Sequence, residues 1–110
     1  MNDCLFCKIV AGEIPVARIY EDAHAIAFRD INPQAPVHVL IVPREHVESV
    51  AEVPDPLAAP LLGAVHRVAM QEGVGDGYRV VTNRGADAGQ SVFHLHFHVL
   101  GGRKMTWPPG

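Results

Sequence analysis

The sequence predicts an α+β domain, with a five-stranded and mainly antiparallel sheet, one long helix and a short N-terminal helix. Five short runs of mostly β-branched or apolar residues are separated by turn-forming residues, which is typical of short strands. Leucine, valine and alanine recur at helical spacing over residues 57–69. With 110 residues, 48% of them hydrophobic, the chain suits one domain over residues 1–110 with one core.

The first half of the chain carries three of the strands. Gly12 ends a short apolar run, and the prolines and asparagine of residues 30–36 predict a loop before the third strand. Pro43 stops that strand, because proline cannot donate to a sheet ladder. In chain order, we expect a helix over residues 5–10, strands over 18–21, 25–29 and 37–42, and a helical turn over 47–50.

The long helix has a recognisable start and end. Pro54-Asp-Pro56 predicts a helix with Asp55 as the N-cap and Pro56 at its first position. Gly73 ends the periodic pattern. A strand over residues 78–82, a loop over 83–90 and a last strand that contains the histidines follow.

Three histidines occupy alternate positions near the C-terminus. Because side chains of a strand alternate between its faces, we expect the three imidazoles on one face and apolar side chains on the core face. Such a row can bind a metal, hold a phosphate, or supply a nucleophile with proton-transfer partners. The residues are His94, His96 and His98 on one face, and Phe93, Leu95, Phe97 and Val99 on the other.

The residues alone leave three interpretations of this row. It can be a histidine-rich surface strand without a function. It can hold a catalytic metal, although the row contains no carboxylate. It can catalyse attack at phosphorus, since neutral imidazole is a competent nucleophile and the glycine-containing loop of residues 85–91 offers backbone N–H groups to a phosphate.

Charge and hydropathy argue against a nucleic-acid-binding, membrane-spanning or secreted protein. The net charge of −3, with acids and bases mixed along the chain, argues against nucleic-acid and membrane surfaces. No apolar run approaches the roughly 20 residues of a membrane span, and the N-terminus lacks the layout of a signal peptide. We therefore expect a cytoplasmic protein, in which the Cys4 and Cys7 pair serves thiol or metal chemistry.

Several separate motifs resemble the histidine triad (HIT) superfamily, in its nucleotide-binding branch. That branch contains purine nucleoside phosphoramidases. The resemblance implies a HIT-like fold and a homodimer whose sheet is continuous across two subunits. The motifs that carry it are residues 6–15, 27–38, 91–103 and the ending Trp-Pro-Pro-Gly110.

The resemblance also implies residue roles. His96 is the expected nucleophile, with His98, His38 and Ser91 as the other catalytic residues, and Asp30 accepts hydrogen bonds from the ribose hydroxyls. The C-terminal tail is expected to bring Trp107 to the partner's site. The other expected nucleotide contacts are Phe6, Ile9, Ile14, Phe28 and Ile31 around the purine, and Asn83, Gly89, Gln90 and Ser91 beside the phosphate and leaving group.

From residue type alone, plainer roles stay open for several of these positions. Asp30 can be a turn-former, His38 a core histidine, and the apolar slot ordinary core. Nothing in the neighbouring sequence explains a tryptophan at position 107 in the tail, unless its ring packs against another surface.

Members of the superfamily that begin with Cys-x-x-Cys bind zinc. The resemblance therefore implies a structural zinc held by Cys4, Cys7, His46 and His94, with no cofactor needed for catalysis. Without zinc, His94 would be a polar member of the active site.

The expected activity is hydrolysis of purine nucleoside phosphoramidates or aminoacyl adenylates through a nucleotidyl-histidine, releasing a monophosphate such as AMP. Two alternatives stay open. One is hydrolysis of dinucleoside polyphosphates, and the other is a non-enzymatic nucleotide-binding or zinc interaction module.

Overall fold

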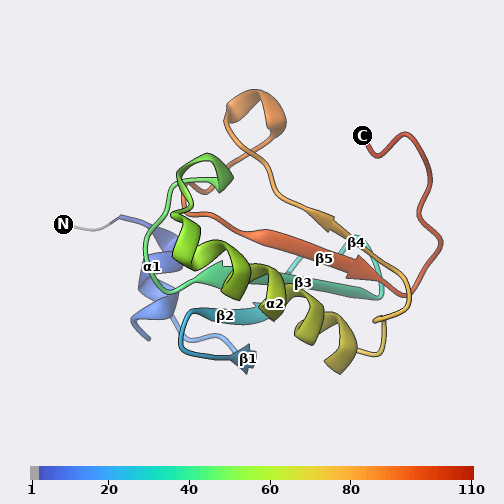
Figure 1. The fold of residues 1–110 in the computed structure, drawn as a ribbon, viewed down its shortest axis with the longest axis horizontal. Coiled ribbons are helices and arrows are strands. Elements are labelled where there is room, and N and C mark those ends of the chain that lie inside the picture. The colour runs from blue at the N-terminus through green and yellow to red at the C-terminus, as the bar shows by residue number, and fades with distance from the viewer. Residues whose placement is uncertain (1–2) are drawn as a thin grey trace.

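The computed structural model describes residues 3–110 and confirms the predicted α+β class (Figure 1). None of the helices in these residues is long and apolar enough to cross a membrane. In chain order, the elements are α1 (Leu5–Val10), β1 (Arg18–Glu21), β2 (Ala25–Arg29), β3 (Val37–Pro43), the 3-10 turn η1 (Val50–Glu52), α2 (Asp55–Gln71), β4 (Tyr78–Val81), the 3-10 turn η2 (Ala86–Ala88) and β5 (Phe97–Gly101).

The five strands form one sheet in the order β1-β2-β3-β5-β4, and each neighbouring pair is antiparallel. The last strand of the chain thus lies between β3 and β4. Its register places His98 opposite Leu40, and Leu100 opposite His38. Hydrogen bonds on both sides of β5 therefore fix the position of His98 in the middle of the sheet.

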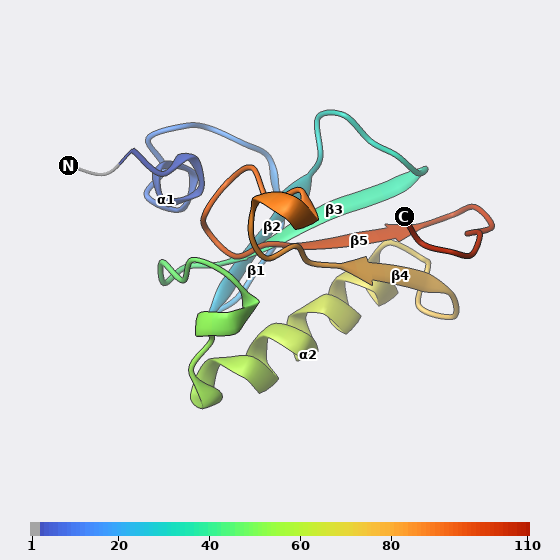
Figure 2. The same ribbon diagram turned by 90° about the horizontal axis from the view of Figure 1, so that it is seen from above.

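The two helices cover opposite faces of the sheet, with α1 on one side and α2 on the other (Figure 2). Alternate residues of β2 belong to two separate core clusters: Ala25 and Ala27 lie in the one under α2, and Ile26 and Phe28 in the one under α1. The same alternation continues in β3. Strands buried on both faces read as continuous apolar runs, which is why these two were clear in the sequence.

Two predictions about the segment before and at the start of α2 are wrong. The helical turn is not at residues 47–50 but at η1, because the Ser49 hydroxyl accepts a hydrogen bond from the N–H of Ala51 at 3.1 Å and starts the turn there. Pro54, not Asp55, is the N-cap of α2, and Asp55 is the first helical residue. The N–H of Leu57 donates to the carbonyl of Pro54 at 2.9 Å and closes this earlier first turn.

The prediction that one strand carries all three histidines is also wrong. β5 begins at Phe97, so His94 and His96 precede it, and Phe93 is 47% exposed instead of forming core. The ladder between β3 and β5 ends at the pair Ile41 and Phe97, two residues before β3 itself ends at Pro43. The chain before Phe97 bonds elsewhere: the N–H of Leu95 donates to the carbonyl of Val47 at 2.6 Å.

Candidate active site and metal cluster

A cavity of about 490 Å³ lies on the α1 side of the sheet. One wall is formed by side chains of α1, and the rest of the lining comes from residues 14 and 16, from β2 and the two residues after it, from β3, and from residues 91–98. Most of the pocket residues expected from the sequence meet here, namely Phe6, Ile9, Ile14, Phe28, Asp30, Ile31, Ser91, His96 and His98.

The cavity also contains residues that the sequence analysis did not single out. Leu40 follows His38 by two positions on β3, so the alternation of that strand could have placed it on this face. For the others, no local signal in the sequence marks a pocket position. They are Leu5, Val16, Arg29 and Val92.

Four residues expected near the nucleotide do not line this cavity: Asn83, Gly89, Gln90 and Trp107. The buried Gln90 side chain accepts from the N–H of Gly85 at 2.8 Å and donates to the carbonyl of Glu48 at 2.7 Å. It therefore holds the loop before the histidines in place. Trp107 is 81% exposed in the single chain.

Hydrogen bonding fixes which nitrogen of the buried His96 ring carries a proton. Nδ1 lies 2.9 Å from the carbonyl oxygen of His94, which can only accept, so Nδ1–H donates. In the neutral ring, Nε2 then holds the lone pair. The ring packs edge-on against Phe6, with centroids 5.1 Å apart. His96 is thus held as a base or nucleophile with Nε2 as its reactive atom.

A second chain of hydrogen bonds places the proton of the neutral His98 ring on Nε2, whereas His96 carries its proton on Nδ1. The N–H of Gln34 donates to Nδ1 of His38 at 3.0 Å, so the proton of the neutral His38 ring is on Nε2. Nε2 donates to Nδ1 of His98 at 2.9 Å, which leaves Nε2–H of His98 as a donor. Asp30 Oδ2 lies 3.4 Å from Nε2 of His38. The pocket therefore holds one imidazole with a lone pair and a neighbouring one with an N–H to offer.

The surroundings of His98 keep its ring neutral. The pKa of His98 is lowered to about 4, mainly by burial and to a smaller extent by the neighbouring His96 and His38, whereas Asp30 opposes the shift. Since the ring is uncharged near neutral pH, it can donate one N–H without carrying a full positive charge into the pocket.

This shift makes a prediction for stability. The unfolded chain protonates His98 near its ordinary pKa of 6.5, above the folded value of about 4, so the unfolded state binds more protons between these values. The free energy of unfolding should therefore fall as the pH drops below about 6.5 and level off below about 4, by at most about 3 kcal/mol from this group. Urea unfolding of wild type and His98→Gln at several pH values measures it. Equal pH dependence in both proteins would contradict it.

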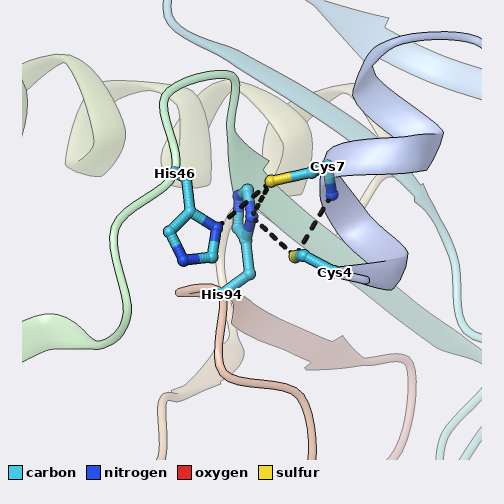
Figure 3. A group of neighbouring side chains, drawn as sticks. All are labelled: Cys4, Cys7, His46 and His94. Carbon is cyan, nitrogen blue, oxygen red and sulfur yellow. Dashed lines mark hydrogen bonds between the residues drawn. The ribbon is translucent and has the colours of Figure 1, made fainter. Parts of the chain in front are cut away.

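Cys4, Cys7, His46 and His94 form a second cluster beside the pocket (Figure 3). Cys4 is the N-cap of α1, and its sulfur accepts from the N–H of Cys7 at 3.3 Å. His94 Nδ1 lies 3.4 Å from the sulfur of Cys4 and 3.5 Å from that of Cys7. His46 Nδ1 lies 3.1 Å from the sulfur of Cys7. Residues far apart in the sequence thus present four donor atoms to one point.

This donor set fits a tetrahedral metal ion. All four donor atoms lie within 4.8 Å of one another. Zinc bonded to two sulfurs and two nitrogens requires donor atoms roughly 3.3–3.8 Å apart. His94 Nε2–H donates to the carbonyl of Pro43 at 2.9 Å, so the lone pair of the neutral ring is on Nδ1, toward the sulfurs. Burial lowers the pKa of His94, which also favours the neutral form that a metal needs.

Asp30, His38 and His98 are also close enough to share an ion, but the proton on Nε2 of His38 argues against a metal there. A metal here would need the lone pair of His38 Nε2. That nitrogen carries the proton, because Nδ1 already accepts from Gln34. The two clusters therefore differ in kind: the Cys and His cluster suits a metal, and the carboxylate and histidine group suits hydrogen bonding.

Comparisons with known proteins agree with this architecture. The family model described as HIT domain matches residues 11–105. The chain is 49% identical over 111 residues to the 14 kDa zinc-binding protein of Zea mays, covering 96% of this chain and 87% of that protein. Two solved structures are similar. The HIT family hydrolase from Legionella pneumophila Philadelphia 1 has a TM-score of 0.93 and 49% identity, covering 98% of this chain and 100% of that one. The histidine triad nucleotide-binding protein from Candida albicans has a TM-score of 0.85 and 34% identity, covering 96% of this chain and 83% of that one.

Proposed function

The chain belongs to the HIT domain family, and we propose that it is a hydrolase of purine nucleoside phosphoramidates that works through a nucleotidyl-histidine. The observation that carries the proposal is the pair of histidines in a cavity of about 490 Å³, His96 with a free lone pair and His98 with a free N–H. The hydrolase and nucleotide-binding protein among the similar structures support the same class of activity.

In the first step, Nε2 of His96 attacks the α-phosphorus and forms a P–N bond. The bond from phosphorus to the departing amine breaks, and the amine nitrogen takes up a proton from solvent as it leaves. His98 Nε2–H donates to the phosphate region, where negative charge grows in the transition state. Phe6 and the other apolar residues of the α1 wall hold the purine, and Asp30 accepts from the ribose hydroxyls.

In the second step, water attacks the same phosphorus and gives up a proton to solvent, which balances the proton that the amine took up. The P–N bond to His96 breaks, the electron pair returns to Nε2, and the nucleoside monophosphate leaves. Because Nδ1 of His96 keeps its proton and donates it in a hydrogen bond to the His94 carbonyl throughout, the ring regains its starting tautomer at the end of each cycle. Ser91, at the edge of the cavity, supplies a further hydroxyl to the phosphate and leaving group.

We also propose that Cys4, Cys7, His46 and His94 hold a structural zinc ion. The donor geometry supports it, as does the similarity to the maize zinc-binding protein. When bound, zinc would join three segments by coordination bonds: the N-terminus, the loop at His46 and the segment that leads into β5. It takes no part in the phosphoryl chemistry, which uses only side chains of the pocket.

The substrate class is tested by rates on three compounds: an adenosine phosphoramidate, an aminoacyl adenylate and a diadenosine polyphosphate. We expect the phosphoramidate or the adenylate to be cleaved with the highest kcat/KM. Faster cleavage of the polyphosphate would favour the alternative hydrolase. Tight AMP binding with no turnover of any of the three would favour a binding module.

A homodimer is the proposed assembly. β4 is an edge strand with a half-exposed Val80, and α2 exposes Leu62 and Met70, so one side of the molecule offers a strand edge beside apolar side chains. The guanidinium of Arg79 on β4 donates to the carbonyl of Thr106 at 2.9 Å and holds the tail beside that edge. Trp107 would then reach the pocket of the partner.

This assembly makes a prediction for Trp107→Ala. We expect kcat/KM of the variant to fall about tenfold, because it lacks one aromatic contact to the substrate in the partner's pocket. Subunits of this variant mixed with the inactive His96→Ala variant should regain activity, because the His96→Ala tail completes the intact pocket of its partner. The measurement is kcat/KM per intact pocket. An unchanged value on mixing would mean that Trp107 does not act across subunits.

A further inference from the structure

We propose that ligation of a metal by Cys4, Cys7, His46 and His94 positions both the nucleophile and one wall of the nucleoside pocket, so that metal and nucleotide bind with positive coupling. The inference rests on the proposed function and on the proposed zinc site. It goes beyond a structural role, because it makes the N-terminal cysteines positioning residues for the pocket.

His94 joins the two sites through different parts of the same residue. Its ring faces the two sulfurs with Nδ1 and the carbonyl of Pro43 with Nε2. Its backbone carbonyl accepts the Nδ1–H of His96 at 2.9 Å. A shift of the His94 residue would therefore move the acceptor that sets the tautomer and orientation of the nucleophile.

The segment that carries His94 and His96 depends on such contacts, because it lies before the start of β5 and outside the sheet ladder. The N–H of Leu95 donates to Val47, and the hydroxyl of Thr82 donates to the carbonyl of His96 at 2.9 Å. Neither bond holds the carbonyl of His94. The bond from the His94 ring to the carbonyl of Pro43 is one anchor of this residue, and metal ligation at Nδ1 would add a second.

The second connection runs through α1. This helix has only six residues, and it carries Cys4 as its N-cap and Cys7 in its first turn, together with Phe6 and Ile9 of the cavity wall. Phe6 also packs edge-on against both His94 and His96. A helix this short is not stable by itself in water, so its position depends on what anchors it.

Loss of the metal should loosen this wall without unfolding the domain. Among residues 3–110, the larger core cluster, under α2, includes no residue of α1. Phe6 and Ile9 belong to the smaller cluster on the other face. The sheet and α2 therefore keep their packing when α1 and the segment before β5 become mobile.

Binding of AMP would order the same two segments by contacting Phe6, Ile9 and His96. Two ligands that each order the same parts of a protein bind with positive cooperativity, and the coupling is reciprocal. We expect AMP to bind about tenfold more tightly to the zinc-loaded protein than to the stripped protein, within the usual range of such couplings. Zinc should bind more tightly by the same factor in the presence of AMP.

The experiment measures AMP affinity by calorimetry on zinc-loaded protein and on protein stripped with a chelator, with circular dichroism of both samples. Zinc affinity with and without saturating AMP gives the reciprocal arm. Signals of the histidine ring nitrogens by ¹⁵N NMR follow the tautomer of His96, which should become mixed on stripping. Equal AMP affinities in the two samples would overturn the inference, as would a global loss of secondary structure on stripping.

Variants at His46 test the coupling without touching the pocket, since this exposed residue is one of the four donors and does not line the cavity. His46→Ala should bind AMP like stripped wild type at zinc concentrations that saturate only the wild type. His46→Cys restores a four-donor set and should restore AMP affinity. Glu45→Gln, at the neighbouring exposed position, should behave as wild type.

The outcomes separate the inference from the proposals beneath it. Failure of the zinc-loaded protein to bind AMP would contradict the proposed function. Failure to bind zinc would contradict the metal site and the inference together. Binding of both ligands without mutual influence would contradict the coupling alone.

Discussion

His96→Ala should lose at least about 10⁴-fold in kcat on an adenosine phosphoramidate, as expected for removal of a covalent nucleophile. AMP should still bind within a fewfold of the wild-type Kd, because the base slot and the ribose contact keep their side chains. The variant also removes the ring that packs on Phe6 and His98, so a small loss of stability accompanies it. Steady-state kinetics and calorimetry measure the two quantities.

The same variant tests the covalent step. Wild-type protein quenched in acid-free conditions during turnover should carry one nucleoside monophosphate, detected by mass spectrometry on the peptide that contains His96. His96→Ala should carry none. His24→Ala is the matched control, since His24 is exposed on the turn before β2 and bonds to Asp22 and Arg44 through its backbone. Near-normal turnover by His96→Ala would refute the mechanism.

Much of the fold could be predicted from the sequence because its strongest signals are local. β2 and β3 are buried on both faces and read as continuous apolar runs, and α2 repeats its apolar residues at helical spacing. The glycines and prolines between elements mark the turns. These patterns follow from which face of each element meets the core, and each can be read without knowing its partner.

The path of residues 91–96 could not be predicted in this way. Strict alternation predicts a strand through His94, but the pairing with β3 ends at Ile41 and Phe97, and the N–H of Leu95 donates to Val47 instead. The role of Gln90 in holding its loop depends likewise on the carbonyl of Glu48. Contacts between segments about 40 to 50 positions apart decide these features, and no local pattern encodes them.

The cluster of Cys4, Cys7, His46 and His94 is intermediate between these cases. Cys-x-x-Cys is visible in the sequence, and it marks two neighbouring candidate ligands. The other two ligands come from separate segments, and only the resemblance to zinc-binding members of the family connected them with the cysteines. The fold adds what the sequence lacks, which is the bond from His94 to Pro43 that directs the free lone pair of the ring toward the sulfurs.

Asp30→Asn is expected to lower kcat/KM about 50-fold on a ribonucleoside phosphoramidate, mostly through KM. The physical reason is loss of the charge that strengthens hydrogen bonds from two ribose hydroxyls, each worth about 1.5–3 kcal/mol with a charged partner. Asparagine retains the acceptor that bonds to the N–H of Asn32 at 2.8 Å, so the turn should keep its shape. Kinetics on ribose and 2′,3′-dideoxyribose substrates measure the effect.

The position of Asp30 offers a second role, and the two substrates separate it from the first. Oδ2 lies 3.4 Å from Nε2 of His38 and 4.0 Å from Nδ1 of His98, so the carboxylate can also act on this histidine pair. If ribose binding dominates, the dideoxy substrate should be cleaved equally by wild type and variant. If the charge acts through the histidines, kcat should fall by the same factor on both substrates. A loss confined to the ribose substrate would thus assign the carboxylate to the sugar, and an equal loss would assign it to the proton arrangement of His38 and His98.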